Sequence, residues 1–200
     1  VAARAAADLR GSLVGVLVNG VPPLRLRHAG ETLVPQLTDR GLPVVGLLPQ
    51  DRLLRAATIR EIAAHLGGQI LFFPDKADEL VEHIMIGALA LDGGLYYFGQ
   101  QENKLVITRW DRPDLQAAAL ETSTKGFILT GGQGPIPYIQ ARIEEAEIPI
   151  VVVQEGTIAT ANRLDGFFSR GALYPQKIQR AGELLETHMD ALVQMVSGGG

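Results

Sequence analysis

Residues 104–146 constrain the fold of this chain more than any other stretch. The apolar run Leu105-Val106-Ile107 is followed by Asp111-Arg112-Pro113-Asp114, an alanine-rich segment, a second apolar run at Gly126-Phe127-Ile128-Leu129 and the turn Thr130-Gly131-Gly132. Short apolar runs suit strands that are buried on both faces, and Asp followed by Pro is typical of a helix start. The stretch therefore predicts strand, helix, strand, glycine turn and helix, which is a parallel arrangement with right-handed crossovers.

The same alternation continues on both sides of this stretch. Further strands are expected at the short apolar runs 12–18, 43–49, 69–73 and 149–153. Helical spacing of apolar residues predicts helices over 29–39, 58–66, 75–91, from Ile136 onward, and over 178–195. For residues 58–66, Thr58 followed by Glu61 three residues later is a capping-box pattern. The predicted fold class is α/β, with mainly parallel sheets and flanking helices.

Glycine pairs and changes of pattern divide the chain into three expected parts. Residues 1–68 are expected to form a first βαβα unit, because Gly67-Gly68 precedes a new set of strands and helices. Residues 69–173 form the second α/β domain, and residues 174–200 form a C-terminal helix and tail. The first residue is Val rather than Met and the last three are glycines. We therefore expect the chain to be part of a longer protein.

Composition and charge exclude several functional classes. The net charge is -4, only 6% of residues are aromatic and there is no basic run, which argues against a nucleic-acid partner. The apolar runs are too short to cross a bilayer, and the charged first ten residues do not resemble a signal peptide, so no membrane partner is expected. The chain has no cysteine. A cytoplasmic location is the simplest expectation.

Sequence patterns of autonomous enzymes are absent. No G-x-x-x-x-G-K-[ST] phosphate loop and no G-x-S-x-G nucleophile elbow occur in the 200 residues. The four histidines lie far apart and none forms an i, i+4 pair, so no metal site is expected. We therefore assign no catalytic residue to the chain as given.

Three loops between a strand and a helix are the best candidates for a binding site. They comprise residues 109–114, 130–134 and 154–157. The carboxyl ends of parallel strands meet at one edge of a sheet, where helix N-termini direct free N–H groups and positive dipole ends. The sequence therefore predicts an anion-binding edge built from these loops.

Each loop also has a purely structural interpretation. Asp111 is expected to cap the following helix, whereas Arg112, which a helix start disfavours, either pairs with an acidic neighbour or meets an anion. Gly131 and Gly132 either permit a tight turn or form an anion-binding nest. Thr157 is expected to cap the next helix.

Two smaller points about these loops stay open. Thr160 faces the same cleft or only its own backbone. Trp110 and Tyr138 either wall a pocket or belong to the core.

The residues of these loops resemble a known family. The pattern Asp111-Arg112-x-Asp114-Leu115-Gln116, then Ile128-Leu129-Thr130-Gly131-Gly132, then Ile148-Pro149-Ile150 and a Thr-rich turn over 157–161 is similar to the DRTGG domain. The chain departs from that family at Trp110, where glycine is usual. The resemblance, over about residues 69–170, implies an α/β module that dimerises and regulates an attached enzyme without catalytic residues of its own.

The first part of the chain resembles a second family. Gly15-Val16-Leu17-Val18-Asn19-x-Val21-Pro22 and Gly46-Leu47-Leu48-Pro49-x-Asp51 are similar to the closing part of a dethiobiotin synthetase-like domain, a relative of the P-loop NTPases. The resemblance places Asn19 near a nucleotide base. The half that would hold the phosphate loop is missing. The two modules occur in this order in phosphotransacetylases, ahead of a catalytic domain that this chain lacks.

Three hypotheses follow. The leading one is a non-catalytic regulatory and ligand-binding module of a phosphotransacetylase-like protein, which forms a homodimer and senses an adenine nucleotide or another anionic metabolite. The second is the remnant of an ATP-dependent dethiobiotin synthetase-like enzyme that needs its missing half, and the third is a purely structural assembly module. The candidate ligand-binding residues are Asp111, Arg112, Thr130, Gly131, Gly132 and Thr157, with Asn19 for the second hypothesis.

Overall fold

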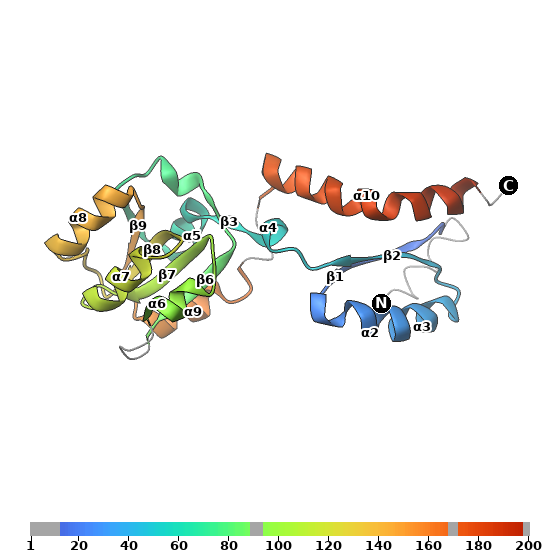
Figure 1. Cartoon of the computed structure of the whole chain (residues 1–200), viewed down its shortest axis with the longest axis horizontal. Helices are drawn as coiled ribbons and strands as arrows, with labels where there is room; N and C mark the ends of the chain where they lie inside the picture. The colour runs from blue at the N-terminus through green and yellow to red at the C-terminus, as the bar shows by residue number, and fades with distance from the viewer. Residues whose placement is uncertain (1–12, 89–93, 168–171, 198–200) are drawn as a thin grey trace. The chain divides into compact units, whose positions relative to one another are not determined.

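The computed structural model describes residues 13–88, 94–167 and 172–197, and the chain divides into two compact units (Figure 1). The first unit takes Val1–Leu54 together with Leu173–Gly200, and the second takes Arg55–Ala172. The second unit thus begins earlier than the double glycine at 67–68. The reason is that Ile59 and Ile62 are fully buried in the same core as the sheet that follows.

The second unit is built on a five-stranded sheet with the order β4-β9-β8-β7-β6. All neighbouring strands are parallel except β4, which runs antiparallel to β9. Two short strands, β3 and β5, pair antiparallel beside it. The strands are β3 (Ala57–Thr58), β4 (Gln69–Leu71), β5 (Leu80–Val81), β6 (His83–Gly87), β7 (Lys104–Arg109), β8 (Thr124–Thr130) and β9 (Ile150–Val153).

Helices cover both faces of this sheet. The helices of the second unit are α5 (Ile59–Leu66), η3 (Lys76–Asp78), α6 (Gly94–Gly99), α7 (Pro113–Leu120), α8 (Pro137–Ala146) and α9 (Thr157–Leu164). Helices α5 and α9 pack on one face, where Ile107, Ile128 and Val151 are in register on adjacent strands and buried. Helices α6, α7 and α8 pack on the other face, over Val106 and Phe127. The sheet is therefore buried on both sides, as its apolar runs predict.

The first unit contains a much smaller sheet. Its strands β1 and β2 are parallel, and α10 and α3 both contact β2 (Figure 1). An ion pair of 2.8 Å joins Arg180 of α10 to Asp51, which follows β2. The elements are β1 (Val16–Val21), η1 (Pro23–Arg25), α2 (Leu26–His28), η2 (Ala29–Leu33), α3 (Val34–Thr38), β2 (Val44–Pro49), α4 (Arg52–Arg55), which crosses into the second unit, and α10 (Pro175–Ser197).

Most of the predicted elements are confirmed. Thr58 is the N-cap of α5 and forms a complete capping box, in which its hydroxyl accepts a hydrogen bond from the Glu61 amide and the Glu61 carboxylate accepts one from the Thr58 amide.

None of the helices in the described ranges combines the length and apolar character needed to cross a membrane.

One predicted helix is wrong. Residues 76–87, expected to be helical, form the short η3 turn and the strands β5 and β6, and Asp75 makes no capping bond with its side chain. The apolar residues from 80 to 86 fit a helical period and a buried strand equally well. The strand prevails because β6 pairs with β7 along its whole length. The end of the predicted helix, at 89–91, lies outside the described residues.

Candidate functional site

A pocket lies at the carboxyl ends of four strands of the second unit, and we call it the rim pocket. Its volume is about 650 Å³, within the range of small-molecule sites. The last residues of β6, β7 and β8 and the loop after β9 all contribute to it, so the three loops do converge. The rim pocket is lined by Gly87, Ala88, Arg109, Trp110, Arg112, Thr130, Gly131, Gln154, Gly156, Thr157, Ile158 and Ala159.

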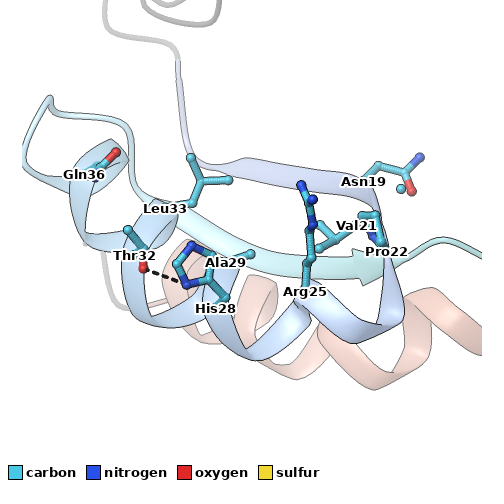
Figure 2. A pocket seen from close by; sticks show the side chains of 10 residues that line it. Asn19, Val21, Pro22, Arg25, His28, Ala29, Thr32, Leu33 and Gln36 are labelled. Carbon is cyan, nitrogen blue, oxygen red and sulfur yellow. Dashed lines mark hydrogen bonds between the residues drawn. The ribbon is translucent and has the colours of Figure 1, made fainter.

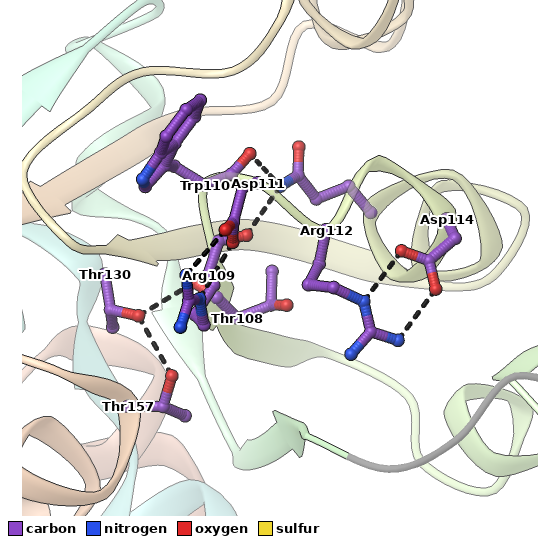
Figure 3. A network of polar contacts seen from close by, with 9 residues as sticks. Thr108, Arg109, Trp110, Asp111, Arg112, Asp114, Thr130 and Thr157 are labelled. Atoms are coloured by element: carbon purple, nitrogen blue, oxygen red, sulfur yellow. Dashed lines mark hydrogen bonds and ion pairs between the residues drawn. The ribbon is translucent and has the colours of Figure 1, made fainter.

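The first loop supplies two guanidinium groups, each held by a carboxylate two residues further along (Figure 3). Arg109 donates to both oxygens of Asp111, at 2.8 and 2.5 Å. Arg112 donates to both oxygens of Asp114, at 2.9 and 2.7 Å. Of the two alternatives for Arg112, this structure therefore shows the acidic neighbour.

These ion pairs fix the protonation of the loop. The hydrogen bonds from Arg109 lower the pKa of the Asp111 carboxyl below its usual value, and those from Arg112 do the same for the pKa of Asp114. The same bonds raise the pKa of each guanidinium. All four side chains are therefore charged at neutral pH.

The backbone of the first loop is held by a buried side chain. Gln116, fully buried in α7, donates its amide hydrogens to the carbonyl oxygens of Arg109 and Trp110, at 2.8 and 3.0 Å. Helix α7 itself begins at Pro113 with Arg112 as its N-cap, and no side chain caps it. The prediction that Asp111 is the N-cap is wrong, because its carboxylate is engaged by Arg109.

The second loop uses its glycines for the turn. Gly131 and Gly132 have φ angles of 94° and 77°, which glycine adopts without strain. The Gly131 amide donates to the carbonyl of Glu155 at 3.2 Å, and the Gly132 amide donates to that of Val153 at 2.9 Å. Both amides are thus engaged inside the fold. Of the two alternatives for these glycines, the structure therefore shows the tight turn, which is tied to the end of β9.

The third loop leads into α9, whose first turn lines the rim pocket. Gly156 is the N-cap and has no side chain to offer, so Thr157 is the first helical residue and the prediction that it caps the helix is wrong. Its hydroxyl instead lies 2.9 Å from that of Thr130 (Figure 3). The Thr160 hydroxyl donates to the Gly156 carbonyl, so of its two alternatives the structure shows the bond to its own backbone. The first-turn amides of α9 have no acceptor within the helix and make this end of the pocket positive.

The predicted site residues are only partly brought together. Arg112, Thr130, Gly131 and Thr157 line the rim pocket, whereas Asp111 and Gly132 lie next to it and outside its lining. Asn19 belongs to the first unit, where it lines a pocket of about 380 Å³ at the end of β1 (Figure 2). No group of His, Cys, Asp and Glu side chains suited to a metal ion occurs in the described ranges.

Sequence reasoning missed several lining residues. Gly87 and Ala88 fall in the wrongly predicted helix, whereas Gly87 ends β6 beside β7 and Ala88 follows it. Arg109 ends its strand two residues before Asp111, and that short spacing was the signal for the ion pair. Ile158 and Ala159 line the pocket because α9 begins at Thr157, one residue earlier than a Thr157 cap would imply.

Comparison with known proteins identifies the second unit. A family model described as the DRTGG domain matches residues 61–167, which is more than half of the chain. The chain belongs to the DRTGG domain family. The rim pocket lies entirely within the matched DRTGG region. The corresponding prediction from sequence is confirmed, whereas the dethiobiotin synthetase-like part stays a prediction.

Curated relatives of this DRTGG protein are phosphate acetyltransferases. One from Synechocystis sp. is 30% identical over 162 residues, covering 76% of this chain and 23% of the relative. Another, from Nitratidesulfovibrio vulgaris, is 32% identical over 160 residues, covering 74% of this chain and 22% of the relative. The chain therefore spans less than a quarter of the length of these curated relatives.

A solved structure is also similar. It is the crystal structure of the CBS and DRTGG domains of the regulatory region of Clostridium perfringens pyrophosphatase, complexed with its activator, diadenosine tetraphosphate. The TM-score is 0.49 at 13% sequence identity, with 75% of this chain and 72% of that chain covered.

Proposed function

We propose that this chain is a non-catalytic regulatory module of a phosphate acetyltransferase-like protein, and that its rim pocket binds an anionic metabolite, an adenine nucleotide being the first candidate. The observation that carries the proposal is the lining of the pocket. Its charged side chains within the described ranges are two arginines, and the open N-terminal turn of α9 adds free amides. Cationic groups and helix N-termini at the carboxyl edge of a parallel sheet favour a negative ligand.

The size of the pocket supports a ligand larger than a simple ion. A volume of about 650 Å³ accommodates a metabolite, whereas an inorganic phosphate would leave most of it empty. Trp110 and Ile158 add apolar surface beside the arginines. The site therefore suits a molecule with a negative group and an apolar part.

A thermal-shift panel tests this proposal. The full 200-residue chain is heated with ATP, ADP, AMP, NADH, acetyl-CoA, pyruvate or phosphate, each at constant ionic strength. A ligand at a hundred times its Kd adds about 2.7 kcal/mol to the stability of the folded state, which raises Tm by several degrees. The double variant Arg109→Ala, Arg112→Ala is expected to lose this shift.

Arg142→Ala is the matched control for that variant. Arg142 lies in the same unit and pairs with Glu121, and its side chain is 27% exposed against 31% for Arg112. The control is expected to keep the ligand-dependent shift. If none of the seven compounds shifts Tm, or if the arginine variant responds like the wild type, the proposed site is wrong.

Homodimerisation is part of the same proposal. Strand β6 is an edge of the five-stranded sheet, and its Ile86 is 37% exposed. An apolar edge strand is a common place for pairing between chains. Light scattering of the wild type and of Ile86→Lys tests this. A dimer that persists unchanged in the variant would place the interface elsewhere, and a monomeric wild type would contradict dimerisation.

A second candidate function rests on the pocket in the first unit. Asn19 lines it together with Arg25 and His28, at the end of a parallel strand (Figure 2). This placement supports the alternative of a residual nucleotide site. A thermal shift by ATP that survives in the rim variant but is lost in Asn19→Ala would favour the alternative.

A further inference from the structure

The rim arginines are held differently from Arg60 and Arg163 of the second unit. Arg163 donates to the backbone carbonyls of His65 and Leu66 as well as to Glu155. Arg60 likewise donates to the carbonyl of Pro74 in addition to Asp78. Such side chains are tied into the fold at several points.

Arg109 and Arg112 have no such additional ties. Within the described ranges, the hydrogen bonds of each guanidinium go only to the carboxylate two residues further along. The Arg109 side chain is 63% exposed and that of Arg112 is 31% exposed. Both arginines can therefore release their carboxylate without breaking another bond.

The two carboxylates stand where they compete with a ligand. Asp111 and Asp114 lie outside the lining of the rim pocket, whereas the arginines that they hold are part of it. Both acids are ionised, since the arginines lower the pKa of each carboxyl. The formal charge of the four side chains is therefore zero, and the cationic pocket is neutralised by its own loop.

We propose that Asp111 and Asp114 are internal competitors, which a phosphate-bearing ligand displaces from Arg109 and Arg112 when it binds the rim pocket. This inference rests on the proposed function and adds the regulation of the site. A tethered carboxylate is always close to its arginine, so a ligand must offer more than an equivalent group. A phosphate dianion has a higher charge and three acceptor oxygens, whereas a monocarboxylate only replaces like with like.

The geometry leaves room for such an exchange to begin. Each carboxylate occupies the Nε and Nη2 edge of its guanidinium. A guanidinium has five N–H donors, and these bonds engage two of them. An incoming phosphate can therefore contact the Nη1 side before the carboxylate leaves.

The test is whether the affinity for ADP rises or falls when the two carboxylates are removed. Calorimetric titration of the full chain with ADP and with pyruvate compares the wild type with Asp111→Asn, Asp114→Asn and the double variant. Each Asn keeps the shape and loses the charge. The double variant is expected to bind ADP about tenfold more tightly, since surface ion pairs are weak and the two carboxylates compete only modestly with a ligand. The wild type is expected to bind ADP and not pyruvate.

Ionic strength supplies a second measurement, which a merely structural role would not move. In the wild type the charges of the four rim side chains cancel, so the affinity for ADP should depend weakly on salt between about 50 and about 200 mM, a range in which the Debye length passes through about 10 Å. In the double variant the pocket is positive, and the dependence should steepen. Glu121→Gln, which removes a carboxylate from the Arg142 pair, is the matched control and should change neither quantity.

The outcomes separate the two proposals. If the double variant binds ADP as the wild type does or more weakly, the carboxylates are positioning groups rather than competitors and the inference is overturned, while the site itself stands. An unchanged salt dependence overturns it as well. If neither protein binds ADP, the inference and the proposed adenine-nucleotide site fall together.

Discussion

The two units of this protein contain strands of similar composition that end up in different environments. In β7, Leu105, Val106 and Ile107 are completely buried, because strands flank them on both sides and helices cover both faces. In β1, Val16, Leu17 and Val18 are only half-buried, since β2 is the single strand paired with them in the described part of the chain. The same apolar run therefore predicts a strand in both units, but burial depends on how many neighbours the strand has.

This difference also separates the two candidate sites. The rim pocket is bordered by four strands, whose ends are held in register and whose loops are tied to each other by backbone hydrogen bonds. The pocket at Asn19 is bordered by one strand end and one helical segment. A site supported by several strands is held in a more definite geometry, which is why the proposed ligand is assigned to the rim pocket.

The largest expected effect comes from removing a buried side chain in each sheet. Ile128→Ala in β8 creates a cavity at a position with no exposure, and we expect a loss of about 3–4 kcal/mol in the free energy of unfolding. Leu47→Ala in β2 affects a half-buried residue and should cost about 1 kcal/mol. Urea denaturation monitored by circular dichroism measures both. Equal losses would contradict the contrast in burial between the sheets.

A smaller effect is expected at two glycines with similar backbone angles. Gly132 has a φ of 77°, and a Cβ there would lie 2.4 Å from the Gln154 side chain. Gly132→Ala should therefore cost about 1–2 kcal/mol and shift Gln154, which lines the rim pocket. Gly20 has a φ of 74° with nothing within 4 Å, so Gly20→Ala should cost about 1 kcal/mol through the backbone alone. Thermal unfolding and ADP titration of both variants measure this, and a weaker affinity for ADP only in Gly132→Ala would support the comparison.

Two threonines sharpen the comparison at the level of helices. Thr58 caps α5 in the second unit through its hydroxyl, and Thr58→Ala should destabilise the protein by about 1 kcal/mol. Thr38 of α3 in the first unit donates to the Val34 carbonyl within its own helix, so Thr38→Ala should change stability by less than about 0.5 kcal/mol. Chemical denaturation of the two variants measures the loss of stability in each. The reverse order would show that the cap contributes less than its geometry indicates.

The smallest expected effect is on the pH dependence of stability. Because the pKa values of Asp111 and Asp114 are lowered in the folded protein, each ion pair adds stability above the unfolded pKa, near about 3.9, and loses it as the pH falls through the folded pKa. The double Asn variant should therefore show a slightly smaller fall in Tm between about pH 5 and pH 2. Asp39→Asn, which removes one carboxylate charge in the first unit, serves as the control for each single Asn variant. Identical pH profiles for the double Asn variant and the wild type would mean that the pairs do not contribute to stability.

Much of the second unit could be predicted from sequence because its signals are local. The strands β7, β8 and β9 are short apolar runs, and parallel pairing then brings the residues after Arg109, Thr130 and Val153 to one edge. The convergence of the three loops follows from this rule alone. The DRTGG resemblance rests on the same residues.

The remaining features depend on neighbours that sequence does not reveal. The glycine pattern at 131–132 indicates a turn, but only the fold shows that the carbonyls of Val153 and Glu155 take up both amides. Thr157 has a side chain that is typical of an N-cap. The N-cap of α9 is nevertheless Gly156, one residue earlier, and the Thr157 hydroxyl forms a hydrogen bond with that of Thr130. Strand β6 was missed because its apolar spacing fits two periods, and β7 decides between them.

The position of Trp110 has a practical consequence. It is the single tryptophan of the chain, it lines the rim pocket, and a Cβ on Gly131 would lie 3.0 Å from its indole ring. Its fluorescence therefore originates at the candidate site and nowhere else in these 200 residues. Quenching or a spectral change on addition of a metabolite would give an optical record of occupancy without any attached dye.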